Sequence, residues 1–160
     1  MSFRKLAMIL ILALVSLTIV LAAAFAIFGF GNRPLEKAQV TVGGKTFQVE
    51  VASTTLARAN GLSGRDGLGE DDGMYFVFDN PGNYGFWMKG MKFPIDIIWI
   101  ADNEVAGFAE NAAPQPGAAL WNLKIYYPPE YVQNVLEVNA GTVKKYQIKV
   151  GDPVSFKGPL

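Results

Sequence analysis

The chain has 160 residues, balances 14 basic against 14 acidic side chains, and contains neither histidine nor cysteine. These absences exclude a histidine general base, a thiol nucleophile, disulfides and most transition-metal ligation, so we expect no metal and no cofactor. Two of the basic residues precede the first apolar segment, and the rest of the chain is slightly acidic, which disfavours nucleic acid as a partner.

An apolar segment, residues 6–30, runs for 25 positions without a charged side chain. A helix of that length would span about 37 Å, enough to cross about 30 Å of hydrocarbon. The basic residues before it favour a cytoplasmic amino terminus. Small residues at 22–24 leave a cleaved signal peptide open as an alternative. We predict an anchor or signal peptide over residues 1–32 and, over residues 33–160, a domain outside the cytoplasm of a single-pass membrane protein.

The folded domain is predicted to begin with a β-hairpin and a short helix. Apolar and polar residues alternate on both sides of Gly43-Gly44, a pair typical of two-residue hairpin turns. Ser53 or Thr54 can cap the helix at its start, and Gly61 suits a left-handed cap at its end. Arg58 lies on this helix.

Further strands are predicted around turn-forming residues. The run 74–78 ends at the turn formers 79–82, so 84–89 is expected to return as its hairpin partner. The run 95–100 is apolar on both faces, as in a central strand, and turns into 105–111. The remaining predictions are a strand over 131–139, an extended but ambiguous stretch over 120–127, a helical turn capped by Thr142, and a short strand ending at Phe156.

This pattern gives about eight short strands and two short helices. It predicts a mainly β, β-rich α+β fold. Many short strands must dispose of their exposed edges, so a compact, closed or nearly closed barrel is expected.

Two carboxylates fall within apolar strands. Asp96 shares a strand face with Ile98 and Ile100, and Glu137 shares one with Val135. Burying a carboxylate is costly unless it is paired, so each needs a partner or a chemical role. The two could act as general acid and base in a hydrolase. In the structural alternative, each pairs with one of the basic residues Arg58, Arg65, Lys89 and Lys92.

Aromatic residues and an acidic loop offer two further candidates. Three tryptophans and three tyrosines could line a groove that stacks on a planar ligand, although core packing is the commoner role: Trp87, Trp99, Trp121, Tyr84, Tyr126 and Tyr127. The acidic residues between 66 and 72 do not follow a calcium-loop spacing and are interpreted as a solvated turn.

Several motifs, in order along the domain, resemble those of domain-of-unknown-function family 192. They are Arg58-Ala59-Asn60-Gly61-Leu62-Ser63-Gly64-Arg65, Gly73-Met74-Tyr75-Phe76-Val77-Phe78, Phe86-Trp87-Met88-Lys89, Pro94-Ile95-Asp96, Val135-Leu136-Glu137-Val138-Asn139-Ala140-Gly141 and Val150-Gly151-Asp152. The resemblance implies a compact, β-rich, barrel-like fold that is commonly exported or membrane-tethered, without an established activity. Ser63 stands where the family usually has methionine.

The family's polar motif positions fall on six residues, and the resemblance implies that these converge: Arg58, Arg65, Trp87, Lys89, Asp96 and Glu137. We expect them to bind a small or extended ligand, with the basic groups on anionic or hydroxyl groups and the tryptophan stacking. We expect binding rather than catalysis. The alternatives are a hydrolase that acts on an envelope polymer through Asp96 and Glu137, and an envelope interaction module without a small-molecule site.

Overall fold

The computed structural model describes residues 5, 8, 11–21 and 34–159. The chain divides into two compact units, Met1–Pro34 and Leu35–Leu160. Residues 11–21 are helical. Within the described part of the chain, no helix combines the length and the apolar character needed to cross a membrane. The predicted anchor, residues 6–30, lies partly outside the described residues.

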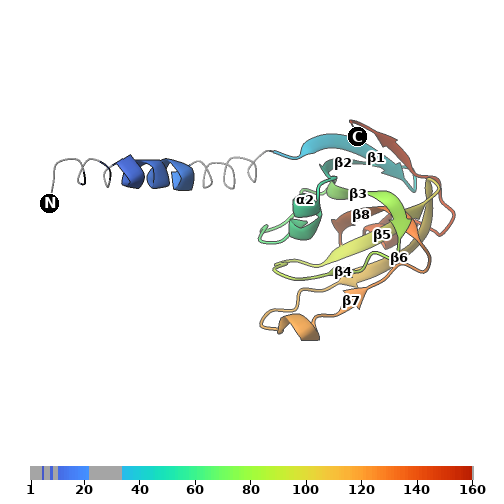
Figure 1. The fold of residues 1–160 in the computed structure, drawn as a ribbon. Helices are drawn as coiled ribbons and strands as arrows, with labels where there is room; N and C mark the ends of the chain where they lie inside the picture. Colours follow the sequence, from blue (N-terminus) through green and yellow to red (C-terminus); the bar gives the residue numbers. More distant parts are fainter. Residues whose placement is uncertain (1–4, 6–7, 9–10, 22–33, 160) are drawn as a thin grey trace. The chain divides into compact units, whose positions relative to one another are not determined.

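The second unit is built on a seven-stranded sheet that curls into a half-barrel (Figure 1). The order across the sheet is β6-β5-β8-β3-β2-β1-β9. Neighbouring strands pair antiparallel except for β2 and β3, which are parallel. The strands are β1 (Glu36–Val42), β2 (Lys45–Ala52), β3 (Asp72–Gly82), β5 (Ile95–Ala101), β6 (Glu104–Ala112), β8 (Val132–Asn139) and β9 (Ser155–Lys157).

The predicted hairpin and the helix after it are confirmed. Gly43 and Gly44, between β1 and β2, have φ angles of 58° and 74°, the left-handed region that a type I′ turn requires. Helix α2 (Thr55–Asn60) begins at Thr54, whose hydroxyl accepts the Ala57 N–H at 3.2 Å. Gly61 ends the helix at a φ of 50° and a ψ of −135°, a positive φ that suits glycine but not the predicted left-handed helical cap. The helix lies in the crossover that parallel strands β2 and β3 need.

The mainly β, α+β class is confirmed, but the barrel closes only in part. At one end the two sheet edges meet: Val105 N–H donates to the Asp152 carbonyl at 2.9 Å, and Val154 N–H donates to the Asn103 carbonyl at 2.8 Å. A single bridge, between Glu104 and Pro153, joins the edges there. Proline lacks the N–H that would extend this ladder, and β9 is only three residues long, so the closure stops.

The predicted hairpin between 74–78 and 84–89 is wrong. Strand β3 continues through Gly82 and pairs with β2 and β8, with a register shift between Val77 and Gly82 that tolerates Pro81 inside the strand. The returning segment forms β4 (Phe86–Trp87), which pairs with β7 (Ile125–Tyr126) in a separate ribbon. The turn formers therefore interrupt the ladder between β3 and β8 without reversing the strand.

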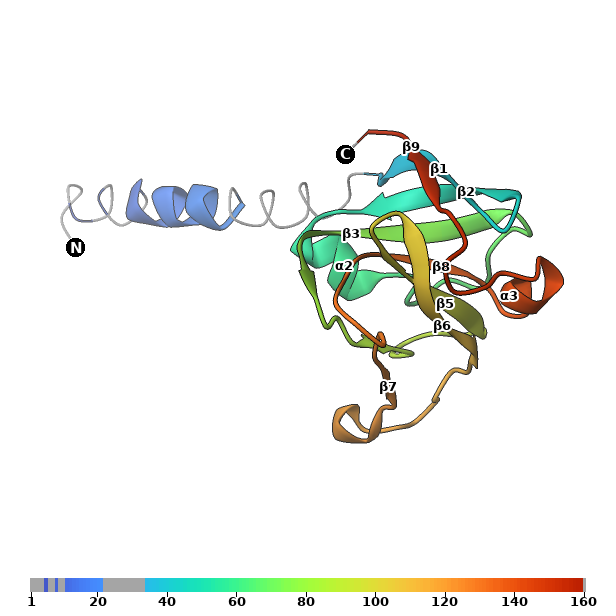
Figure 2. The ribbon, with the colours of Figure 1, turned by 90° about the vertical axis from the view of Figure 1, so that its right-hand side faces the viewer.

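Two short helical elements complete the domain. Helix η1 (Leu120–Asn122) precedes β7 on an arm that projects from the sheet (Figure 2). Helix α3 (Thr142–Lys145) follows β8. Its cap is Gly141, at a φ of 84°, and Thr142 is its first residue rather than the predicted cap.

Both faces of the sheet carry buried apolar side chains, because successive residues of a strand point to opposite faces and many of them are apolar. On β8, Leu136 and Val138 belong to a first core, which Val143 and Ile148 complete. Val135 belongs to a second core on the opposite face, which Leu62 and Met88 cover. Strand β5, which lies inside the sheet between the edge strand β6 and β8, is buried along almost its whole length, as its apolar sequence predicts. The second face carries the cavity described next.

Candidate functional site

A cavity of about 250 Å³ opens on the face of the second core. Four parts of the chain surround it: α2 with the loop that follows, strand β3, the segment around β4, and β8. Most lining side chains are aromatic or apolar, and the few polar ones include Arg58, Asn60, Ser63 and Glu137. A cavity of this size holds a compact ring compound, since an engineered cavity of about 150 Å³ already binds benzene.

Aromatic rings from β3 and from the segment around β4 form one wall. Phe76 meets Phe86 edge to face with ring centroids 4.9 Å apart, and Phe78 stacks on Tyr84 at 3.6 Å. These contacts depend on Gly85, where a Cβ would lie 2.6 Å from Ile125 Cγ2. Glycine at this position thus lets β4 and β7 pack closely. The ring pairs stabilise the wall in addition to the burial of their apolar surface.

Arg58 reaches the cavity from the last turn of α2. Its Nη1 donates to the carbonyls of Ser53 at 2.6 Å and Val77 at 2.7 Å, and its guanidinium lies 5.1 Å from the centre of the Phe78 ring. These contacts fix the end of α2 against β3.

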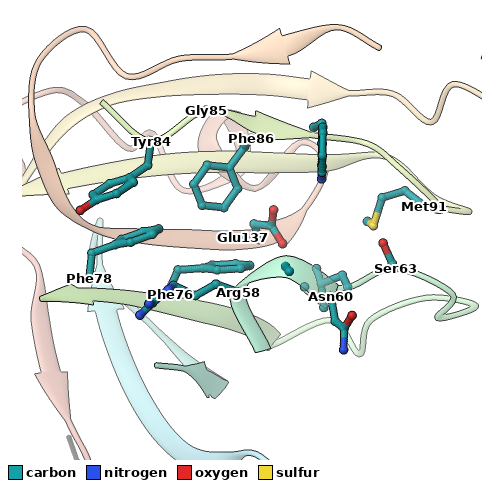
Figure 3. A pocket seen from close by; sticks show the side chains of 14 residues that line it. Arg58, Asn60, Ser63, Phe76, Phe78, Tyr84, Gly85, Phe86, Met91 and Glu137 are labelled. Atoms are coloured by element: carbon teal, nitrogen blue, oxygen red, sulfur yellow. The ribbon is translucent and has the colours of Figure 1, made fainter. Parts of the chain in front are cut away.

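Glu137 points into the cavity from β8 (Figure 3). The residue is 5% exposed, and within the described part of the chain no group donates a hydrogen bond to its carboxyl and no basic side chain pairs with it. Burial raises the pKa of this carboxyl to about 8. Near neutral pH it is therefore largely protonated, a neutral acid in an aromatic surrounding. The structural alternative, in which Glu137 pairs with a basic side chain, is therefore wrong for this residue.

Asp96 is also buried, but on the opposite face of the sheet. In the register of β5 and β8, Asp96 is opposite Val138 and Ile97 is opposite Glu137, so the two carboxyl groups point away from each other. Asp96 accepts the backbone N–H groups of Asn111 and Val143, both at 2.8 Å. Its partners are thus backbone amides and not the predicted basic side chains. The pairing of the two carboxylates in a hydrolase is also wrong.

The other predicted site residues divide between the cavity and the surrounding surface. Trp87 lines the cavity and is 47% exposed. Lys89 lies outside it, with its Nζ 5.7 Å from the centre of the Trp87 ring. Arg65 forms a two-point ion pair with Glu50, at 2.9 and 2.5 Å, in a neighbouring groove. Of the six residues, the structure brings together Arg58, Trp87 and Glu137.

Three phenylalanines of the cavity wall were not predicted as site residues. Phe76 and Phe78 are two positions apart on β3, and Phe86 follows on β4. Period-two alternation places Phe76 and Phe78 on one face, so a signal was present. Only the register between β3 and β8 shows that this face is the one that carries Glu137, because Phe76 lies opposite Val135, two positions before Glu137 on β8.

The acidic loop residues lie near lysines. The ion pairs are Asp66 with Lys92 at 2.7 Å, Glu70 with Lys145 at 2.6 Å and Asp71 with Lys45 at 2.6 Å. These side chains are mostly exposed, in keeping with the predicted solvated turn.

The fold and the cavity define a class: a β-rich domain with a curled sheet and an aromatic cavity that contains one buried acid. The chain belongs to the DUF192 family, described as Uncharacterized ACR, whose model matches residues 38–156. The comparison with curated proteins gives no match.

Among the crystal structures that resemble this chain are two that each have a TM-score of 0.69 and 33% sequence identity to it. One is a protein of unknown function from Novosphingobium aromaticivorans DSM 12444, for which the match covers 76% of this chain and 86% of that one. The other is described as a candidate transcription regulator from Sinorhizobium meliloti 1021, with 79% and 97% covered. The family resemblance inferred from the sequence motifs is therefore confirmed.

Proposed function

We propose that the domain binds a small organic ligand in the aromatic cavity, with Glu137 as its main polar contact. The observation that carries this proposal is the unpartnered Glu137 carboxyl, buried at a cavity large enough for a ring. The carboxyl oxygens are open to the cavity, since they are not among the fully enclosed side-chain atoms that lack a hydrogen bond, and a polar group in such a place is hydrogen-bonded to water or to a ligand. A ligand that supplies the missing partner gives a reason for a group that otherwise opposes folding.

The surrounding side chains suit this role. Phe76, Phe86 and Trp87 offer flat apolar surface, and Asn60 and Ser63 add polar groups beside it. Ligand sites typically combine a mostly apolar lining with a few convergent polar groups. The half-exposed Trp87 is the residue through which a longer ligand would extend out of the cavity.

A comparison of two tryptophans tests the proposal. Compact ring compounds would be screened against the full-length protein by ligand-detected NMR, and the best binder titrated against Trp87→Ala and Trp121→Ala. Trp121 is 86% exposed and does not line the cavity, so it is the matched control. We expect Trp87→Ala to weaken binding about tenfold, as loss of a stacking ring does, and Trp121→Ala to leave it unchanged. Equal effects of the two substitutions, or unfolding of Trp87→Ala, would contradict the proposal.

The site of action is a second part of the proposal: the domain is held at a membrane by residues 6–30 and lies outside the cytoplasm. The uncharged length of that segment and the basic residues before it support this placement. Protease added to spheroplasts, whose outer barrier has been opened, should then degrade the domain, whether it is periplasmic or extracellular. Protection in intact spheroplasts, with degradation only after lysis, would contradict this placement.

A further inference from the structure

The cavity is lined by one acid, Glu137, and one cation, Arg58, which do not form an ion pair with each other. Arg58 is the other charged side chain that lines it, and its Nη1 is committed to the carbonyls of Ser53 and Val77. Burial alone accounts for the raised pKa of Glu137, without a contribution from a neighbouring charge. Because Arg58 neither pairs with Glu137 nor contributes to its pKa, a positive charge in direct contact with the ionised carboxylate would come from the ligand.

The cavity walls favour a positive charge. The faces of aromatic rings attract cations, most strongly when the cation is shielded from water. The protein already uses this contact at both ends of the site: Arg58 lies over Phe78 at 5.1 Å, and Lys89 lies over Trp87 at 5.7 Å. The rings of Phe76 and Phe86, which line the cavity with Glu137 (Figure 3), have no such cation among the described residues.

On these grounds we propose, building on the function above, that the ligand carries an organic cation, an amidinium or a protonated amine on a compact apolar body. The cation would donate hydrogen bonds to the Glu137 carboxylate while its apolar body packs against Phe76, Phe86 and Trp87. Such charge-assisted bonds are roughly twice as strong as neutral ones and give direction to the binding.

Binding of a cation would release a proton from the protein. The ionisable groups that line the cavity are Glu137 on β8, Arg58 on α2 and Tyr84 before β4. With the pKa of Glu137 at about 8, the empty site is protonated at pH 7, and a cation selects the ionised form. Cation affinity should therefore rise about tenfold per pH unit up to about pH 8, and level off above it.

Three probes of the same shape and different charge test the proposal: benzamidine, benzamide and benzoate. Isothermal titration calorimetry on the full-length chain in detergent, from about pH 6 to about pH 9, gives the affinities; buffers of different ionisation enthalpy give the proton release. The variants are Glu137→Gln and the matched control Glu110→Gln, an exposed acid outside the cavity. Binding of such small probes is expected in about the millimolar range.

The expected result is that benzamidine binds at least about tenfold more tightly than benzamide at pH 8, and that its binding at pH 7 releases close to one proton. Glu137→Gln should abolish both effects while retaining weak benzamide binding, and Glu110→Gln should change neither. If benzamide or benzoate binds as tightly as benzamidine, the proposal of a cationic ligand is wrong, while the proposed function of the cavity as a ligand site still stands. If no probe binds the wild-type protein, both the cation and the proposed cavity function fail.

Discussion

Asp96 and Glu137 lie on neighbouring antiparallel strands, one position apart in register, and are both almost completely buried. Their surroundings differ. Asp96 faces the first core and accepts two backbone N–H groups, which tie the end of β6 and the start of α3 to β5. Glu137 faces the second core and accepts none from the described residues. Burial alone therefore does not distinguish a structural carboxylate from a candidate ligand contact; the donors around it do.

The largest effect is expected from Asp96→Asn. In Asp96→Asn, one carboxylate oxygen is replaced by an NH2 group, which donates and cannot accept. At least one of the two backbone N–H groups therefore loses its acceptor, and the charge-assisted hydrogen bonds are lost. We expect the free energy of unfolding to fall by about 4 kcal/mol. Urea denaturation followed by circular dichroism measures this loss. Asp102→Asn, in the exposed turn between β5 and β6, is the control and should change stability by less than about 0.5 kcal/mol. A loss below about 1 kcal/mol for Asp96→Asn would remove the structural role.

For Glu137→Gln we expect the opposite of a loss: above the ordinary glutamate pKa, the variant should be more stable than the wild type. The unfolded chain ionises this group near the ordinary glutamate pKa of 4.5, whereas the folded chain holds its proton up to about pH 8. Between these values the unfolded state binds fewer protons, so wild-type stability falls as the pH rises. Relative to Glu137→Gln, which has no such titration, we expect the wild type to lose about 3 kcal/mol between about pH 5 and about pH 8. Parallel stability curves for the two proteins would show that Glu137 is not buried as a neutral acid.

Arg65→Met tests the ion pair between Arg65 and Glu50, which is only partly buried. Hydrogen bonds from Arg65 lower the pKa of Glu50, and both side chains are about one-third exposed. A two-point ion pair in this position should contribute about 1 kcal/mol at neutral pH. Because the folded-state pKa of Glu50 is depressed, this contribution should disappear in acid, below the ordinary glutamate range, where Glu50 is protonated. A double-mutant cycle with Glu50→Gln isolates the coupling; an undiminished loss at low pH would assign the effect to packing instead.

The smallest effect is expected from Asp66→Asn, which removes the pair with Lys92. Side-chain exposures of 94% and 54% leave this pair in water, where such contacts contribute little. We expect a change below about 0.5 kcal/mol, further reduced in high salt. Thermal denaturation at low and high ionic strength provides the check, and a loss as large as that of Arg65→Met would mean that the acidic loop does more than solvate a turn.

Local sequence determined the elements whose signals are short-range. The glycine pair between β1 and β2, the amino-terminal cap of α2 and the apolar run of β5 each specify backbone conformation or burial within a few residues. Period-two alternation also placed Asp96 with Ile98 and Glu137 with Val135 on buried faces. These predictions depend on φ preferences, capping hydrogen bonds and side-chain direction, which a short segment carries by itself.

Tertiary structure alone decided which residues meet. The register between β5 and β8 put the two carboxylates on opposite faces, and a shift of one position would have put them on the same face. The pairing of β4 with β7 instead of β3, and of Arg65 with Glu50 rather than with a buried acid, likewise joins segments that are distant in the chain. Such contacts depend on strand register and on packing between elements, so no local pattern in the sequence specifies them.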